Sequence, residues 1–286
     1  MATGIWNGAS ADPTLEANWT GISTFANGDV LIVPANATVD MNGGDMTAEA
    51  EFSQFIVENG CSIAIGSAST PLNISVDNGD KLIDFGGTGV AYLDIDNADN
   101  VTIRNAGTTQ TSGVNPLNLT GSSNTNLNII TGSASIGVAA NAGETAAFTN
   151  INVNGGTVYL GRNVTTTAIN QTSGIIDALS GCTNLTLDEG TFYQREGGIT
   201  NPTVNGGTLY YNSDDTITTL IVYGSVDVSG GIGDLTITNA TIYKGGSIND
   251  QYERATFTNG IDIANCRIAD VTLDLGQNFT ITKSAI

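Results

Sequence analysis

The sequence predicts an all-β fold, namely a right-handed parallel β-helix (a β-solenoid) with a short N-terminal aromatic cap. Three observations lead to this prediction. Apolar and polar residues alternate in short runs, as they do in strands, and no stretch has the 3.6-residue apolar period of a helix. Gly, Asn, Thr and Ser dominate the polar residues, and they favour turns and strands over helix interiors. A short phrase also returns along the chain at multiples of about 17 residues.

The repeated phrase is a threonine followed by an apolar residue and a tyrosine. It begins at Thr157, Thr191, Thr208 and Thr241, so successive phrases are separated by one or two steps of about 17 residues. Gly often precedes the phrase directly, and it tolerates the backbone angles of a tight corner. Each unit therefore reads as two short strands around a corner. The repeat is strongest over residues 147–248 and less regular over residues 58–138.

Strands this short bury their apolar side chains only when successive units stack on one another. Each strand then pairs in parallel with the equivalent strand of the next coil, and equivalent side chains form inward columns. Because parallel β crossovers are right-handed, we expect a right-handed coil. The first expected column is Val158, Ile175, Phe192, Leu209, Val226 and Ile242, and the second is Val153, Leu187, Val204 and Ile237.

We divide the chain into an N-terminal cap or attachment segment, residues 1–27, and a parallel β-helix, residues 28–286. The first segment is rich in turn residues and contains both tryptophans, Trp6 and Trp19. A solenoid has an open sheet edge at each end, which must be covered to prevent polymerisation. We therefore expect the aromatic side chains of the cap to plug the first coil.

The composition excludes several functions. The chain has 8 Lys+Arg against 28 Asp+Glu and a net charge of −20, so we expect no binding to nucleic acid or to an anionic membrane surface. The three cysteines, Cys61, Cys182 and Cys266, have long spacings and form no CxxC motif, which indicates buried free thiols. The N-terminus lacks the features of a signal peptide, and no apolar run is long enough to span a membrane. If the chain is complete, these features indicate synthesis and folding in a reducing cytoplasm.

Little in the sequence points to catalysis. The chain has no His, so a His general base and the Ser-His and Cys-His pairs are excluded. One acidic group remains, because the repeat brings Arg162, Glu196 and Asp214, with the adjacent Asp215, to one column of loops. Paired carboxylates at such a surface hydrolyse glycosidic bonds in some enzymes. Mixed charges on short loops are more often solvated surface, so we favour a protein that is not an enzyme.

We expect neither a metal ion nor a cofactor. Asp94, Asp96 and Asp99 alternate along one strand and offer oxygen ligands of the kind that Ca²⁺ binds. Calcium needs six or more oxygen ligands, and the segment does not match an EF-hand loop. Solvated carboxylates on an outer face are the preferred interpretation.

A set of tyrosines has two interpretations that we leave level. Because strand side chains alternate in direction, the tyrosines of the repeated phrase point outward when the apolar residue before each points inward. They would form an interrupted column on one face, and tyrosine is enriched at protein interfaces. Tyrosine also simply suits strands. Stacking of sugars on the rings is a third interpretation. The interface candidates are Tyr159, Tyr193, Tyr210, Tyr243, Trp6 and Trp19.

The beginning of the chain carries a resemblance. Residues 5 to about 40 contain W-N-G, N-W and then G-D-V-L-I-V-P-A-N-A-T-V. This pattern resembles the start of β-helical surface proteins of bacteria and their bacteriophages. The resemblance implies a structural virion protein, either a capsid decoration (cement) protein or a short head fibre that binds and stabilises the shell. It further implies the major capsid protein as partner, a homotrimer, and assembly into the virion in the host cytoplasm.

Two other functions stay open. One is a tailspike-like polysaccharide hydrolase or receptor-binding protein, for which Glu196, Asp214 and Asp215 are the candidate carboxylates. The other is a bacterial adhesin or passenger fragment whose export signal has been removed.

Overall fold

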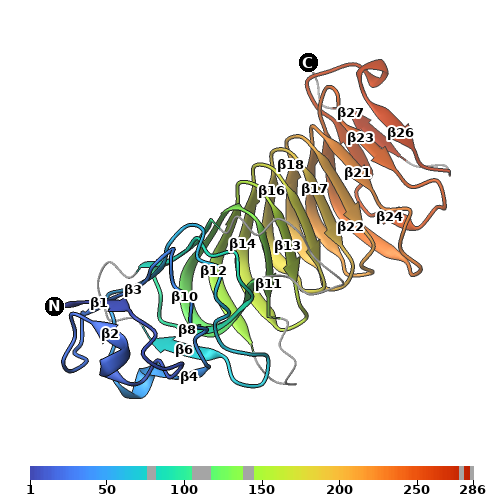
Figure 1. Cartoon of the computed structure of the whole chain (residues 1–286). Coiled ribbons are helices and arrows are strands. Elements are labelled where there is room, and N and C mark those ends of the chain that lie inside the picture. Colours follow the sequence, from blue (N-terminus) through green and yellow to red (C-terminus); the bar gives the residue numbers. More distant parts are fainter. Residues whose placement is uncertain (76–81, 105–116, 138–144, 277–279, 284–286) are drawn as a thin grey trace. The chain divides into compact units, whose positions relative to one another are not determined.

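The computed structural model shows an all-β parallel solenoid of about 10 turns, which confirms the predicted fold class (Figure 1). It describes all residues except 76–81, 105–116, 138–144, 277–279 and 284–286. The described residues form strands and three short 3-10 helices, and none of them lies in an α-helix. The chain comprises two units, Met1–Thr165 (unit 1) and Thr166–Ile286 (unit 2). Strand β14 (Val164–Gln171) spans their boundary.

The elements of unit 1 are mostly short, as the alternating runs of the sequence predict, and the exception is β10 with 15 residues. They are β1 (Thr3–Trp6), η1 (Glu16–Asn18), β2 (Trp19–Thr20), β3 (Val30–Val33), β4 (Gly44–Asp45), η2 (Met46–Ala48), β5 (Gln54–Val57), β6 (Leu72–Ser75), β7 (Leu82–Phe85), β8 (Ala91–Asp96), β9 (Asn100–Arg104), β10 (Leu117–Thr131), β11 (Ser133–Ile136), β12 (Ala146–Val153) and β13 (Thr157–Leu160).

Unit 2 is more regular, and all of its strands are short. Its elements after β14 are β15 (Ile175–Ala178), β16 (Cys182–Leu187), β17 (Thr191–Gln194), β18 (Ile199–Val204), β19 (Thr208–Tyr211), β20 (Ile217–Val222), β21 (Ser225–Asp227), β22 (Leu235–Ile242), β23 (Ser247–Asn249), β24 (Ala255–Phe257), β25 (Ile261–Ile263), η3 (Ile268–Asp270), β26 (Thr272–Asp274) and β27 (Ile281–Lys283).

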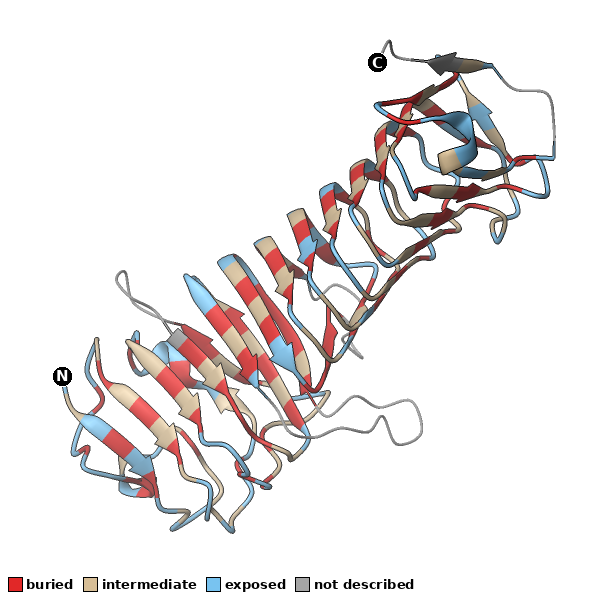
Figure 2. Ribbon diagram, turned by 90° about the horizontal axis from the view of Figure 1, so that it is seen from above, coloured by how far each residue is buried: buried red, intermediate tan, exposed pale blue. Residues whose placement is uncertain are grey.

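Each unit is built from two ladders of parallel strands, which we call sheet A and sheet B. In unit 1, sheet A contains β1, β3, β5, β7, β9, the second part of β10 and β12, whereas β4, β6, β8, the first part of β10, β11 and β13 belong to sheet B. In unit 2, β16, β18, β20, β22, β25 and β27 belong to sheet A, and β15, β17, β19, β21, β23 and β26 to sheet B. Buried and more exposed residues alternate along the strands, so the core lies inside each coil (Figure 2).

The inward column of sheet B confirms the predicted repeat at its centre. Phe192 pairs with Leu209, and Leu209 pairs with Val226, so each of these two coils advances the chain by one repeat. The prediction is wrong at Ile175, because Ile176 occupies the column and Ile175 is 42% exposed. The coil that joins Ile176 to Phe192 is a single residue shorter than the repeat, and such a shift turns a strand's side chains to the other face.

The prediction is also wrong at Ile242. Val226 pairs with Ile248, so the coil between them is longer than the repeat. The additional residues lie partly before Ile242, in the segment that contains the loop before β22, and partly in the turn between β22 and β23. Ile242 belongs to sheet A, where it pairs with Val222. Loop length is not constrained by the stacked strands, and this is why the repeat loses its phase here.

The second column is confirmed at the pair of Leu187 and Val204. It continues through Val222, so the expected member Ile237 is wrong. Ile237 is buried, but it pairs with Ile217 and Phe257 in another row of the same sheet.

Two aromatic side chains are buried in the first coil of unit 1. Strand β1 pairs in parallel with β3 and so begins sheet A, and β2 covers its other edge in antiparallel pairing. Trp6 and Trp19 pack edge to face at 5.2 Å between ring centroids, and both are buried. Trp19 donates its indole hydrogen bond to the carbonyl of Pro13 at 2.8 Å, so the polar atom of the buried ring is satisfied. Both rings are therefore buried where sheet A begins, and the role of residues 1–27 as a cap stays a prediction.

The cysteines are three buried free thiols, as the sequence predicts. Burial raises the pKa of Cys61 above its ordinary value and raises the pKa of Cys182 from 9.0 to about 12. Across the residues that the structure describes, no helix has the length and apolar character needed to cross a membrane.

Candidate functional sites

The candidate carboxylates lie on loops that follow the sheet-B strands of unit 2. We call them the corner loops, and they cover residues 179–181, 195–198, 212–216 and 228–234. Glu196 lies in the loop after β17, and Asp214 and Asp215 lie in the loop after β19. Because β17 and β19 are paired neighbours, the two loops belong to adjacent coils, as the repeat predicts. Arg162 lies in unit 1, between β13 and β14, and its predicted place in the same column stays a prediction.

The corner loops are held from inside by buried polar side chains. Gln194, which ends β17, is fully buried. Its amide nitrogen donates to the carbonyl of Ser180 at 2.8 Å, to that of Gly197 at 3.2 Å, and to that of Glu196. Buried carbonyl groups need such partners, since an unmet one costs about 1–3 kcal/mol. The backbone of Glu196 is thus tied to the interior.

Tyr211 has the same role one coil further along. It pairs with Gln194 in the ladder and is also fully buried. Its hydroxyl donates to the carbonyl of Asp215 at 2.9 Å and accepts from the amide of Ile199 at 3.3 Å. Burial is the largest cause that raises the pKa of Tyr211 above its ordinary value, which keeps this hydroxyl a neutral donor.

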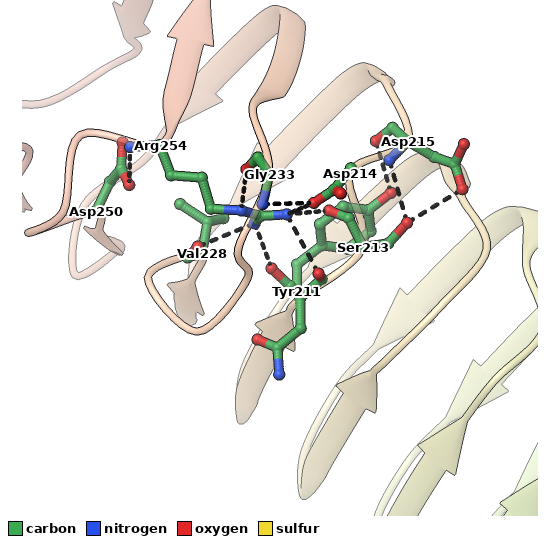
Figure 3. A network of polar contacts seen from close by, with 9 residues as sticks. Tyr211, Ser213, Asp214, Asp215, Val228, Gly233, Asp250 and Arg254 are labelled. Carbon is green, nitrogen blue, oxygen red and sulfur yellow. Dashed lines mark hydrogen bonds and ion pairs between the residues drawn. The ribbon is translucent and has the colours of Figure 1, made fainter.

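Arg254 completes this buried polar set (Figure 3). It precedes β24, and its side chain is 4% exposed. The guanidinium group reaches back to two corner loops and donates to one carboxylate and five carbonyls. The carboxylate is that of Asp214, at 2.8 Å. The carbonyls belong to Gly233 (2.7 Å), Tyr211 (2.9 Å), Val228 (3.0 Å), Asn212 (3.2 Å) and Ser213.

The segment before Arg254 fixes its backbone. The carboxylate of Asp250 is buried and accepts from the amides of Arg254 at 2.9 Å and Ala255 at 2.8 Å. On the other side, the loop of residues 230–233 wraps the ion pair. A Cβ atom at Gly231 would collide with the guanidinium, and one at Gly233 would collide with the Asp214 carboxylate. Glycine is therefore required at both positions for the loop to lie this close.

These contacts give the candidate carboxylates an architectural part. Asp214 pairs with the buried arginine, although its own side chain is 55% exposed. Asp215 accepts a hydrogen bond from the hydroxyl of Ser213 at 3.1 Å, and the same hydroxyl accepts from the Asp215 amide at 3.1 Å. Both carboxylates stabilise the turn that carries them. Whether Glu196, Asp214 and Asp215 also act on a glycan stays a prediction.

The strand with alternating aspartates forms side-chain hydrogen bonds to the next coil. Asp94 accepts from the hydroxyl of Thr120 at 3.2 Å, and Asp96 accepts from the amide and hydroxyl of Ser122, both at 2.7 Å. Outside the undescribed segments, no group of three or more acidic or cysteine side chains is arranged to hold a metal ion.

The tyrosines form two separate stacks. Tyr193 and Tyr210 lie on the outer face of sheet B with their rings parallel, 4.9 Å apart. Tyr243 is not in this column, so the predicted single column is wrong there. It stacks instead on Tyr223 at 4.2 Å, beyond the ends of β22 and β20. Tyr159 lies in unit 1, where it pairs with Ser135.

The stack on sheet B is closed at one end. The guanidinium of Arg195 lies 4.8 Å from the ring centre of Tyr193 and also pairs with Asp177, the residue before Tyr193 in the same row. One face of the Tyr193 ring is thus occupied by Tyr210 and the other is contacted by arginine. Sugar stacking needs an open ring face, so for Tyr193 this arrangement favours a role in stability or in edge contacts. The proposed interface role of the tyrosines and of the buried Trp6 and Trp19 stays a prediction.

Unit 1 contains two surface hollows. One, of about 210 Å³, is lined by Trp6, Asn7, Gly8, Pro34 and residues 36–39. The other, of about 510 Å³, lies at the ends of β5, β7 and β9. Ile56 and Val57 form part of its lining, with Glu58, Asp84 and Arg104 as charged members.

Two features were missed at the level of the sequence. Arg254 is one of only 8 cationic residues, and its place shortly after Asp250 was the available signal. The second feature is the outer face of β1, β3 and β5, described below. Its signal was the continuous apolar run VLIV at residues 30–33, which is typical of strands covered on both faces.

Comparisons of the chain with protein-family models, with curated proteins and with solved structures found no match.

Proposed function

We propose that the chain is a non-enzymatic structural protein of a bacteriophage particle, a capsid decoration (cement) protein or a short head fibre. In this proposal it binds the major capsid protein and stabilises the shell as a homo-oligomer, most simply a trimer. One observation supports the proposal that the chain is not an enzyme. Two of the three candidate carboxylates are engaged in holding the corner loops, since Asp214 pairs with the buried Arg254 and Asp215 accepts a hydrogen bond from Ser213.

The construction of the protein also supports a structural role. Its described core is apolar side chains stacked coil upon coil, and its cysteines are free and buried. Free buried thiols need no oxidation to fold, which suits assembly in a reducing cytoplasm. The net charge of −20 keeps coated particles apart by repulsion.

The test uses shells of the phage that encodes the chain, prepared from a deletion mutant that lacks it. Purified chain is added to these shells, and binding is measured by co-sedimentation and electron microscopy. We expect saturable binding at fixed positions of the shell lattice and a rise in the shell's melting temperature. Absence of binding contradicts the proposal.

The hydrolase alternative is tested with the same purified chain. The chain is incubated with host capsular and O-antigen polysaccharides, and released reducing ends are counted. We expect none above the level of a Glu196→Gln and Asp215→Asn double variant. Hydrolysis that this double variant abolishes would replace the structural proposal with the tailspike-like one.

A further inference from the structure

The outer face of the first three sheet-A strands carries a row of isoleucines. Ile5 of β1 pairs with Ile32 of β3, which pairs with Ile56 of β5. We call these three residues the isoleucine row. Ile5 is 44% exposed, and the other two are half-buried.

The isoleucine row is not needed for the core of these coils. The inward residues of the same strands are Leu31, Val33, Phe55 and Val57, and all four are buried. Strands with one face in the core and one in water normally show polar residues on the outer face. Apolar residues on both faces indicate that the outer face is covered by something else.

The row ends abruptly along the solenoid. The next outward residue after Ile56 is Asp84, which pairs in turn with Thr102. The chain further on has Asn128 and Asn152 in the same row, joined by an amide hydrogen bond of 2.9 Å. The apolar outer face is therefore confined to three coils and is not a general feature of sheet A.

The isoleucine row is continuous with the larger hollow. Ile56 belongs to both, and the hollow of about 510 Å³ extends from it to Arg104. At that margin Arg104 and Asp84 form an ion pair. These two charges offset each other, and Glu58, which also lines the hollow, leaves it with one net negative charge, so the hollow belongs to the rim of the face and not to its neutral part.

We propose that the isoleucine row and this hollow form a self-association surface, occupied by a second copy of this chain. The distribution of charge favours a second copy as the partner. The outward residues of β1, β3 and β5 are all uncharged, whereas the whole chain carries −20. A basic partner would be recognised by carboxylates, and the outer face of these three strands offers none. Two like-charged copies meet with least repulsion where each is neutral and apolar.

Geometry also suits a second copy. Identical rows have identical strand spacing, about 4.8 Å, so the isoleucines of two copies related by a rotation axis pack in matching steps. Three short strands cover on the order of 200 Å² per copy, against about 800 Å² per partner in a standard stable interface. The row is thus the apolar centre of the contact, and neighbouring polar residues form its rim. This size predicts an association that depends on protein concentration.

The experiment measures the mass of the purified full chain by analytical ultracentrifugation between about 1 and 100 μM, a range that covers micromolar dissociation constants. We expect the mass to rise from one chain to two or three with concentration. The double variant Ile5→Ser with Ile32→Ser should raise the dissociation constant at least tenfold. Circular dichroism and thermal unfolding establish that the variant is folded.

Ile221→Ser is the matched control. Ile221 is also a half-buried outward isoleucine of sheet A, but it lies in unit 2 between two threonines, Thr203 and Thr241. This variant should associate like the wild type. A wild-type chain that stays monomeric over the whole concentration range overturns the proposal, and so does an Ile221→Ser variant as defective as the double variant.

Cysteine crosslinking provides a measurement in which the isoleucine row is unchanged. Thr3 is exposed beside Ile5, and the three natural cysteines are buried. Thr3→Cys should form a disulfide-linked dimer under mild oxidation, whereas Thr236→Cys, at an exposed strand position of unit 2, should not. Equal crosslinking of both variants overturns the proposal.

This inference rests on the proposed function for the homo-oligomer, to which it assigns a surface, but it can be tested apart from shell binding. A chain that associates but does not bind shells supports self-association and contradicts the virion role. A chain that stays monomeric, and loses shell binding when Ile5 and Ile32 are serine, instead assigns the row to the shell.

Discussion

The outer face of sheet A is apolar in one region of the molecule and polar in another. In the first coils of unit 1 the outward residues are isoleucines in register, Ile5, Ile32 and Ile56. In the central coils of unit 2 they are threonines and asparagines, such as the paired Thr186 and Thr203. The amides of Asn184 and Asn201 even bond to each other along this face, at 3.2 Å.

The inward faces of the two regions are similar, because both bury aliphatic columns. The difference therefore does not come from what a coil needs in order to stack. It shows that the outer face of a solenoid is set by its surroundings, which are water in one region and, in our proposal, a contact surface in the other. A second difference lies inside, where unit 2 uses Gln194, Tyr211 and Arg254 to hold its corner loops.

The largest expected effect tests that internal polar set. Arg254→Met removes the donor for five carbonyls and one carboxylate and should lower the free energy of unfolding by about 3–5 kcal/mol. Urea unfolding followed by circular dichroism measures the change. The matched control is Arg195→Met, since Arg195 pairs with Asp177 at the surface, where such pairs contribute about 1 kcal/mol or less. Equal losses in the two variants would show that the buried network has no special weight.

An intermediate effect is expected from pH, and it differs between the two units. Below pH 9 the thiol of Cys182 is protonated in both folded and unfolded chains. Between pH 9 and about 12 only the unfolded chain ionises it, because burial raises the pKa of the folded thiol to about 12. The free energy of unfolding should therefore fall as pH rises above 9, by up to about 1.4 kcal/mol per pH unit.

Urea unfolding at pH 8, 9 and 10 measures this slope. Cys182→Ala should remove the part of this slope that comes from ionisation of one thiol. Cys61→Ala, the control in unit 1, also has a raised pKa and should remove a smaller share, because a backbone hydrogen bond to that cysteine partly opposes the effect of burial. A slope unchanged in Cys182→Ala would show that this thiol is not the group responsible.

The smallest effect on stability, but the sharpest comparison, comes from transferring the isoleucine row to unit 2. Thr203→Ile with Thr241→Ile places isoleucines on both sides of Ile221 in register. The free energy of unfolding should change by less than about 1 kcal/mol, because β-branched residues replace one another on an outer strand face. In the background of Ile5→Ser and Ile32→Ser, the transferred row should restore concentration-dependent association in the ultracentrifuge. If association is not restored, an apolar row alone is insufficient.

The site could be predicted only in part, for a physical reason visible in single residues. The repeat correctly placed Glu196 and Asp214 on loops of adjacent coils, because strand stacking fixes the step from one coil to the next. It could not show that Asp214 pairs with Arg254, which is 40 residues away. That contact depends on the glycine-containing loop of residues 230–233, and the pairing of the strands does not determine the conformation of this loop.

The parallel solenoid, the burial of the cysteines and the pairing of Phe192 with Leu209 could all be predicted from the residues alone. These follow from alternation and from a repeat that each strand must satisfy with its neighbours. The folded chain was needed to establish that Ile176 and not Ile175 is inward, that Tyr243 stacks on Tyr223, and that three isoleucines share one outer row. Coil length between strands sets all three outcomes, and it is governed by loop contacts that are local in space but distant along the chain.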